Sequence, residues 1–273
     1  MEAQLRNIYC ISLEDSDRKQ GFLEAFKPLS IPINFIQATD GRSRKPVAPD
    51  WLHNLEIHKN YSSNLRKEIP VLNYELSSRE LACAISHLRV WHTVANFNHE
   101  DYVLVCEDDA IPRNIESFEH DLNEILDEMK TGEFVYIGYT GGLSEKRKLW
   151  PLRVVWHFIK RFPIYGSLPN RFRFNRSVLV SRKRRIGKNH IMRAGQHWGA
   201  FGYLINRTSA NHLVRLNKNL EMTSDGTFRY ARLSNTMRMS VASRGLVIVE
   251  SKYDSSIRSS AEQTENFANY EFG

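Results

Sequence analysis

The stretch Tyr102–Asp109, YVLVCEDD, decides the fold class. Its first five residues are apolar and β-prone, which predicts a short buried strand. Three consecutive carboxylates end the stretch, those of Glu107, Asp108 and Asp109. Active sites of open α/β sheets gather at the carboxyl ends of strands. The stretch therefore predicts a sheet strand that delivers acidic side chains to a functional edge.

The segments on either side of this strand predict helices. Upstream, Ser77-Ser78-Arg79-Glu80 reads as a capping box. Apolar residues at helical spacing follow it: Leu81, Ile85, Leu88, Trp91 and Ala95. Downstream, a second helix carries Phe118, Leu122, Ile125, Leu126 and Met129, and residues 133–138 read as another strand. Helices alternating with strands indicate an α/β domain.

The N-terminal segment predicts a parallel βαβ unit. Residues 7–13 and 33–37 read as strands, and Asp15 to Lys27 has helical spacing between them. Residues 42–74 are rich in Pro, Asn and Ser and predict a long excursion from the sheet.

The C-terminal third is predicted more sparsely. Residues 201–205 read as a strand, Thr208 is expected to cap a helix that runs through Leu216, and residues 246–250 read as a last strand. A polar tail starts at Ser251.

Composition places the chain among ordinary globular proteins. It has 273 residues, of which 41% are hydrophobic and 25% charged. The cysteines are odd in number and lack metal-like spacing, so we expect a reduced, intracellular protein: Cys10, Cys83 and Cys106. Neither a secretory signal nor a membrane-spanning stretch is visible, so we expect any membrane contact to be peripheral.

Positive charge is concentrated between Lys146 and Arg193. This segment holds fifteen Lys or Arg and no Asp or Glu, so the rest of a chain of net charge +7 carries −8. Aromatic residues interleave with the cations: Trp150, Trp156, Phe158, Phe162, Tyr165, Phe172 and Phe174. Such a mixture is typical of a binder of anionic membrane surfaces or of a lipid-linked, phosphorylated acceptor. A solvated loop or a flap packed on the domain is the alternative.

The acidic triplet suits a divalent cation. In an extended backbone Glu107 and Asp109 would face one side and Asp108 the other. Carboxylate oxygens are the ligands that Mg²⁺ and Mn²⁺ prefer, and such ions bridge to phosphates. An acidic turn that caps the helix behind it is the alternative.

The predicted helix after Ser77 adds a second cluster. Glu80, Cys83 and His87 lie at i, i+3 and i+7 and therefore on nearly one face. Each also has a structural explanation: a capping glutamate, a small apolar filler and a hydrogen-bonded, half-buried histidine. Asp225-Gly226, far downstream, reads as a turn.

Together these segments resemble glycosyltransferase family 25, the lipopolysaccharide and lipooligosaccharide glycosyltransferases. The segment from Glu80 to His87, with Cys83 and Ser86, is similar to the family's E-x-x-C-x-x-S-H element. The other similar segments are the opening strand with Arg18, Ala38 to Gly41, Glu107 to Asp109, Gly199 to Ile205, Asp225, and Asp254 to Ile257. The segment 146–193 matches nothing in the family pattern.

The resemblance implies a single GT-A-like domain over 1–273, with a mostly parallel mixed sheet flanked by helices. Residues 1–145 would bind the nucleotide sugar, 146–193 would be a basic aromatic insertion, and 194–273 would form the acceptor side and tail. The implied reaction is inverting transfer of a hexose from UDP-galactose or UDP-glucose to a lipooligosaccharide glycan. The protein would work on the cytoplasmic face of the bacterial inner membrane.

The resemblance also implies roles for single residues. Glu107 and Asp109 would hold Mn²⁺ or Mg²⁺, and Asp225, or failing it Asp108, would be the general base. Glu80 and His87 would face the diphosphate or donor sugar. Nucleotide-sugar contacts would come from Ile11, Ser12, Leu13, Arg18, Thr39, Asp40, Ser86 and Glu107.

Two other functions use the same features. The basic segment 146–193 could track a nucleic-acid backbone and stack bases, although this leaves the acidic strand end unexplained. The same carboxylates could serve a metal-dependent phosphohydrolase, although few additional ligands are in view. We therefore expect a glycosyltransferase that does not bind nucleic acid.

Overall fold

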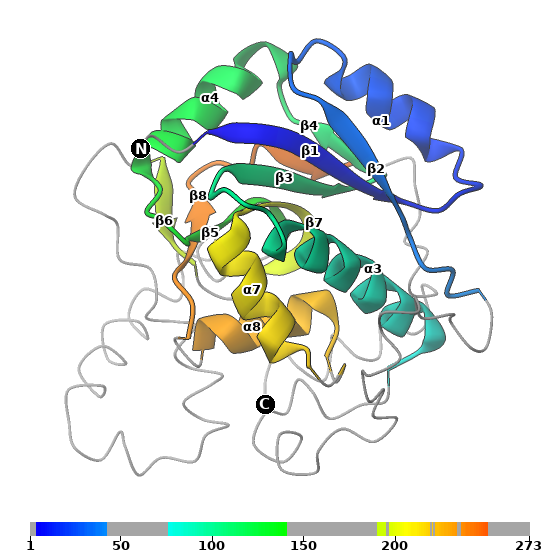
Figure 1. The fold of residues 1–273 in the computed structure, drawn as a ribbon. Coiled ribbons are helices and arrows are strands. Elements are labelled where there is room, and N and C mark those ends of the chain that lie inside the picture. The colour runs from blue at the N-terminus through cyan, green and yellow to red at the C-terminus, as the bar shows by residue number, and fades with distance from the viewer. Residues whose placement is uncertain are drawn as a thin grey trace, which may run out of the picture.

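The structure is a computed structural model that describes residues 4–42, 76–140, 190–194, 197–218, 220, 222–233 and 236–250. Strands and helices alternate through most of these ranges (Figure 1). The strands are β1 (Leu5–Ser12), β2 (Ile33–Gln37), β3 (Tyr102–Glu107), β4 (Ala110–Pro112), β5 (Phe134–Thr140), β6 (Ile191–Arg193), β7 (Trp198–Ile205), β8 (Met239–Ala242) and β9 (Val247–Val249). The helices are α1 (Arg18–Phe26), α3 (Ser78–Ala95), α4 (Ile115–Glu128), α7 (Arg207–Leu216) and α8 (Ser224–Leu233).

One mixed sheet organises these elements. Its strand order is β2-β1-β3-β7-β5-β8-β6, and β9 joins β5 to β4. The strand β1 runs parallel to both β2 and β3, whereas β7 lies antiparallel between β3 and β5. Six of the nine described strands point the same way, so the predicted α/β, mostly parallel mixed sheet is confirmed.

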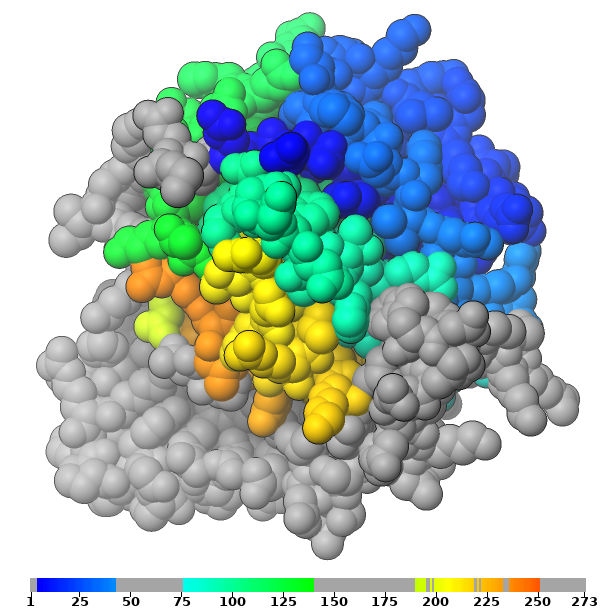
Figure 2. All heavy atoms as spheres, in the orientation of Figure 1, coloured from blue at the N-terminus to red at the C-terminus, as the bar shows by residue number. Residues whose placement is uncertain are grey.

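Helices cover both faces of the sheet. On one face Ile8 and Cys10 of β1 belong to a core shared with α1 and α4. On the other face Tyr9 and Ile11 belong to a core shared with α3, α7 and α8. Successive side chains of a strand point to opposite faces, so β1 contributes to both cores. Figure 2 shows α3 and α7 side by side over the second face.

The predicted capping box starts α3. The Ser77 hydroxyl accepts from the Glu80 backbone N–H at 3.2 Å, and the Glu80 carboxylate accepts from the Ser77 N–H at 3.0 Å. Both contacts satisfy N–H groups that the helix itself leaves unpaired. In the segment after β2, Gly41 approaches the start of α3 so closely that a Cβ there would lie 2.6 Å from the Arg79 Cα.

Two local predictions were wrong. Asn206, and not Thr208, caps α7, because the Asn206 side chain accepts from the Ser209 N–H while the Ser209 hydroxyl accepts from the Asn206 N–H. Asp225-Gly226 lies in the first turn of α8 and not in an isolated turn. The strands β4, β6 and β8 were not predicted, since three or four residues carry too little periodicity to be recognised.

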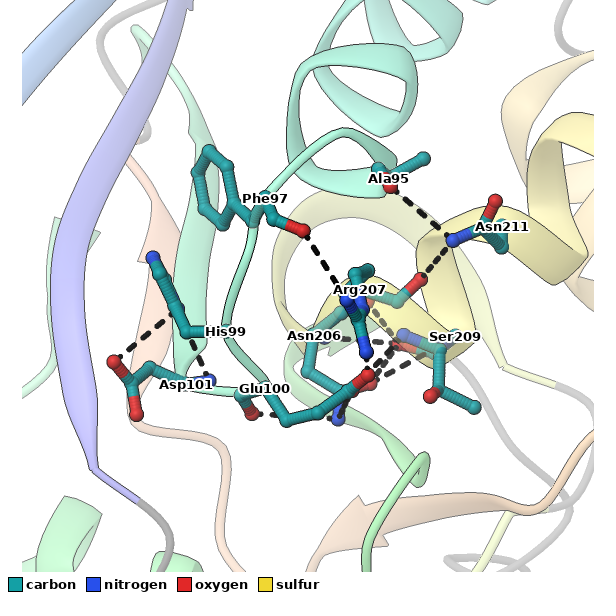
Figure 3. A network of polar contacts seen from close by, with 10 residues as sticks. Ala95, Phe97, His99, Glu100, Asp101, Asn206, Arg207, Ser209 and Asn211 are labelled. Atoms are coloured by element: carbon teal, nitrogen blue, oxygen red, sulfur yellow. Dashed lines mark hydrogen bonds and ion pairs between the residues drawn. The ribbon is translucent and has the colours of Figure 1, made fainter.

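Glu100 ties the start of α7 to the loop before β3 (Figure 3). Its Oε2 accepts from the Asn206 side-chain amide at 2.8 Å and from the Thr208 N–H at 3.2 Å. Its Oε1 accepts from Arg207 Nε at 2.8 Å. A carboxylate at a helix N-terminus is stabilised both by the free N–H groups and by the helix dipole. This contact fixes α7 against the edge of the sheet opposite to the acidic triplet.

Candidate functional site

The triplet Glu107, Asp108 and Asp109, here called the acidic corner, stands at the carboxyl end of β3. The parallel strands β2, β1 and β3 end at the same edge, so the residues that follow β1 and β2 gather around it. Asp108 and Asp109 form a turn before β4 begins at Ala110. This edge is where the sequence predicted the site.

Asp108 serves as an anchor for the loop after β1. Its Oδ2 accepts hydrogen bonds from Ser12 Oγ and Ser16 Oγ, each at 2.6 Å. Its Oδ1 lies 3.8 Å from Arg18 Nη1. Hydroxyl-to-carboxylate bonds this short are strong, so Asp108 is held in place by its neighbours.

Asp109 presents an oxygen that no hydrogen bond satisfies. Oδ2 lies 3.5 Å from Arg18 Nη1, but Oδ1 is buried and has no hydrogen-bond partner within the described ranges. Burial, together with the charge of Glu107, raises the pKa of this carboxyl to about 7, although the charge of Arg18 opposes the shift. A buried acceptor without a partner is costly. A cation bound there would remove the cost, so Asp109 fits the predicted ligand role.

The strict alternation expected across the triplet does not occur. Asp108 and Asp109 both approach Arg18, whereas Glu107 contacts His87. The extended strand ends at Glu107, and the turn that follows breaks the two-residue period. The same contacts pair Arg18 with the acidic corner.

Glu107 joins the acidic corner to α3. Its Oε1 lies 3.2 Å from His87 Nε2. On the other side of the ring, His87 Nδ1 lies 2.8 Å from the Tyr203 hydroxyl. That hydroxyl accepts a hydrogen bond from Trp91 Nε1 at 2.9 Å. Tyr203 reaches this position because β7 pairs with β3, with Tyr203 opposite Val105. His87, expected to be half-buried, is completely buried.

Cys83 also lies beside this pair. Three potential ligand atoms, one each from Cys83, His87 and Glu107, lie within 4.8 Å of one another. The Cys83 sulfur is 3.8 Å from Ser224 Oγ of α8. Burial raises the pKa of the thiol well above its ordinary value, and the charge of Glu107 adds to the shift. Cys83 is therefore a protonated, polar neighbour and not simply an apolar filler.

Asp225 comes to the same place from far along the chain. Its Oδ2 accepts from the Gly199 N–H at 3.1 Å, and Gly199 has a φ of +93°, which favours glycine. Burial raises the pKa of Asp225 to about 6; the Gly199 hydrogen bond opposes the shift and the charge of Glu107 adds to it. The structure thus brings Asp225 near the acidic corner and leaves it able to titrate near neutrality.

The remaining predicted residues lie at this edge or just beneath it. Ile11 and Ser12 are buried at the end of β1, and Leu13 is half-buried beyond it. The Thr39 N–H donates to Ser86 Oγ at 2.9 Å, which joins the loop after β2 to α3. Asp40 is held by Arg42, whose hydrogen bonds lower the pKa of the Asp40 carboxyl.

Sequence reasoning missed Tyr203, Trp91 and Ser16 as members of the site. Trp91 appeared only as a core position, although its place at i+4 from His87 puts both on one helix face. Tyr203 appeared inside a predicted strand and in the family-like segment Gly199 to Ile205, but without a role, because nothing local to β7 indicates that it meets α3. Ser16 appeared only as part of a helix start.

Glu80 keeps the capping position that its spacing predicts, and it is buried. Glutamine also completes a capping box. We expect Glu80→Gln to change the free energy of unfolding by less than about 0.5 kcal/mol, whereas Ser77→Ala should cost about 1 kcal/mol. Urea denaturation followed by circular dichroism measures both.

The same pair of variants separates the two roles of Glu80. A loss of sugar transfer in Glu80→Gln, without the loss of stability, would assign Glu80 to the reaction. If sugar transfer instead falls only as far as the stability falls, and does so in Ser77→Ala as well, Glu80 is a capping residue alone.

A family model described as Glycosyltransferase family 25 (LPS biosynthesis protein) matches residues 5–228. The chain belongs to glycosyltransferase family 25. This confirms the resemblance found in the sequence, and the matched range includes the acidic corner, His87 and Asp225. Family 25 membership makes the chain a glycosyltransferase, with a sugar donor and a glycan acceptor. A search of curated proteins finds no match.

The acidic corner is distinct from a cleft of about 750 Å³ at the opposite edge of the sheet. That cleft is lined by residues before β3, β5 and β8 and by α7, including Phe97, Gly132, Arg207, His212 and Arg238. None of the predicted site residues lines it. Within the described ranges, no helix combines the length and apolar character needed to span a bilayer.

Proposed function

We propose that this family 25 enzyme transfers a hexose, with inversion, from a UDP-sugar to a lipooligosaccharide or lipopolysaccharide glycan. UDP-galactose is the preferred donor in this proposal and UDP-glucose the next. One observation carries the metal-dependent part of it: the buried, unpartnered Oδ1 of Asp109 beside Glu107 at the carboxyl edge of the sheet. Family membership favours this function over nucleic-acid binding or phosphate hydrolysis.

Glu107 and Asp109 would hold Mn²⁺ or Mg²⁺. Their carboxylates match the oxygen ligands that these ions prefer. Glu107 Oε1 meets His87, and its Oε2 has no hydrogen-bond partner among the described residues. A bound cation supplies neutralisation of the diphosphate as it leaves the sugar. The protein's own part is to keep two carboxylates in place and partly out of water.

Asp225 is the proposed general base. An inverting transfer needs one group that takes the proton of the acceptor hydroxyl. A carboxyl whose pKa is raised to about 6 is ionised at neutral pH and still basic enough to accept that proton. Asp108 is less suited, because two serine hydroxyls already occupy its Oδ2. The Gly199 N–H would orient the Asp225 carboxylate toward the acceptor.

The uridine is proposed to lie against the ends of β1 and β2. The contacts would come from Ile11, Ser12, Leu13, Thr39 and Asp40, with Arg18 close to the diphosphate. His87, Glu80 and Ser86 would support the donor from α3. The common edge of the parallel strands supports this assignment, because it gathers these residues around the acidic corner.

A transfer assay tests the whole proposal. The protein is incubated with MnCl₂, deacylated lipooligosaccharide and, in parallel, radiolabelled UDP-galactose, UDP-glucose and UDP-N-acetylglucosamine. We expect label in the glycan, mainly from UDP-galactose, and a β linkage by NMR. Label from none of the UDP-sugars, or release of free phosphate without any acceptor, would refute it.

The segment 146–193 is proposed to hold the enzyme on the inner face of the cytoplasmic membrane. Residues 146–189 of this segment lie outside the described residues. The sequence of the segment alone therefore supports this part of the proposal. We expect the protein to sediment with vesicles that contain phosphatidylglycerol, and to be released at about 0.5 M NaCl, where charges are strongly screened. Equal binding to phosphatidylcholine vesicles would contradict an electrostatic anchor.

A further inference from the structure

A chain of buried hydrogen bonds runs from the core to the acidic corner. Trp91 Nε1 lies 2.9 Å from the Tyr203 hydroxyl, that hydroxyl lies 2.8 Å from His87 Nδ1, and His87 Nε2 lies 3.2 Å from Glu107 Oε1. Tyr203 and His87 are 0% exposed and Trp91 is 1% exposed. Water therefore does not supply substitute partners to the first three groups.

The direction of each bond in this chain follows from what each group can donate. The indole N–H of Trp91 only donates, so the Tyr203 oxygen accepts from it. The Tyr203 hydroxyl can still donate one hydrogen bond, and His87 Nδ1 is the acceptor within reach. If Nδ1 accepts, the proton of the neutral imidazole is on Nε2, where it points at the Glu107 carboxylate.

The other protonation states of His87 leave groups unsatisfied. A proton on Nδ1 would leave the Tyr203 O–H without an acceptor in this chain. With that proton alone on the ring, Nε2 would also set its lone pair against a carboxylate oxygen. Buried polar groups are nearly always paired, so the fully satisfied arrangement is favoured.

We propose that Tyr203, oriented by Trp91, is a positioning residue that fixes His87 as the Nε2–H tautomer and so aims the Glu107 carboxylate. His87 would donate to Glu107 Oε1 and leave Oε2 for a cation. The tautomer follows from the hydrogen bonds alone; only its use in catalysis rests on the proposed function.

This assignment also decides how the group of Cys83, His87 and Glu107 works. Their ligand atoms are close enough for a metal such as zinc to be considered. A metal on His87 Nε2 needs the lone pair of that nitrogen, which the proposed tautomer uses for a proton. The group is therefore a hydrogen-bonded support for Glu107 and not a histidine-ligated metal site.

The substitution Tyr203→Phe removes the hydroxyl and keeps the ring, which stacks on Phe134 and meets Phe228 edge-on. The tautomer is read from long-range ¹H–¹⁵N spectra of metal-free protein labelled at histidine, with His87→Gln to assign the signal. We expect the Nε2–H pattern in the wild type and a loss of that single pattern in Tyr203→Phe. A wild type with the proton on Nδ1, or on both nitrogens at pH 8, would overturn the proposal.

Calorimetry with MnCl₂ and UDP gives the second readout. We expect Tyr203→Phe to weaken metal-dependent UDP binding by about tenfold, as is typical when a group that orients a ligand is removed. The matched control is Tyr102→Phe, which removes another buried hydroxyl, bonded to Lys130 O at the opposite edge. Unchanged affinity in Tyr203→Phe, or an equal loss in Tyr102→Phe, would count against positioning.

The two readouts keep this inference separate from the proposed function. Stoichiometric zinc binding that is lost in both Cys83→Ser and His87→Gln would replace the positioning role with a metal site. An Nε2–H tautomer in the wild type, together with weakened metal-dependent UDP binding in Tyr203→Phe, would support positioning even if no UDP-sugar served as donor. The absence of any UDP-sugar donor would refute only the proposed transfer reaction.

Discussion

Asp109→Asn is expected to lower metal-dependent UDP affinity by about 100-fold or more, because groups that merely orient metal ligands already cost 10- to 100-fold. Asparagine keeps the size of the side chain but removes the charge that the buried Oδ1 carries toward a cation. Calorimetric titration of UDP with and without MnCl₂ measures the change. Sugar transfer should fall with it.

The same substitution should stabilise the metal-free protein. Burial and the charge of Glu107 raise the pKa of Asp109 from 3.8 to about 7, so the folded state holds this proton more tightly than the unfolded chain. The stability of the wild type is therefore highest below about pH 4, where Asp109 is protonated in both states, and it falls as pH rises through 7. We expect the Tm of metal-free Asp109→Asn to exceed that of the wild type at pH 8 and to approach it at pH 4.

Opposite signs for binding and stability distinguish a lost ligand from a misfolded protein. Asp101→Asn is the matched control, because Asp101 precedes the same strand at its other end and pairs with Arg6. It should leave UDP affinity unchanged. Manganese-dependent UDP binding that survives Asp109→Asn would remove the basis for the proposed metal site.

Asp225→Asn should lower kcat by about 10²- to 10⁴-fold, the usual contribution of a general base. The asparagine oxygen can still accept from the Gly199 N–H, so we expect the local structure and UDP affinity to persist. Steady-state kinetics with saturating donor, together with calorimetry, separates the two quantities.

The dependence of sugar-transfer activity on pH provides a second test of Asp225 as the general base. The base works in its ionised form, and burial raises the pKa of Asp225 to about 6, so wild-type activity should fall as pH drops below about 6. Asp225→Asn should lack this acidic limb. Asp108→Asn provides the comparison: if that variant loses kcat and the limb while Asp225→Asn keeps both, the base is Asp108.

The sequence predicts those parts of the fold that local pattern controls. The apolar run from Tyr102 to Cys106 predicts β3, and the spacing from Ser77 to Glu80 predicts the capping box, because both signals lie within a few residues. The position of the acidic corner follows from the general rule for the carboxyl ends of strands. These features depend on no distant contact.

The rest of the site depends on long-range pairing. Tyr203 meets His87 only because β7 enters the sheet antiparallel beside β3, a register that β7 alone does not reveal. Asp225 reads as a turn residue because aspartate followed by glycine favours turns locally, whereas packing of α8 under α3 overrides that preference. Asp108 and Asp109 turn together toward Arg18 because the extended strand ends at Glu107, before alternation reaches either residue.

The bond between Gly199 and Asp225 sets a limit on protein engineering. It fastens the first residues of β7 to the first turn of α8, across 26 positions of sequence. A chimera that recombines family members at a junction between these two residues would take the carboxylate from one parent and its backbone donor from another. Crossovers placed before β7 or after α8 would inherit both together, and should give active hybrids more often.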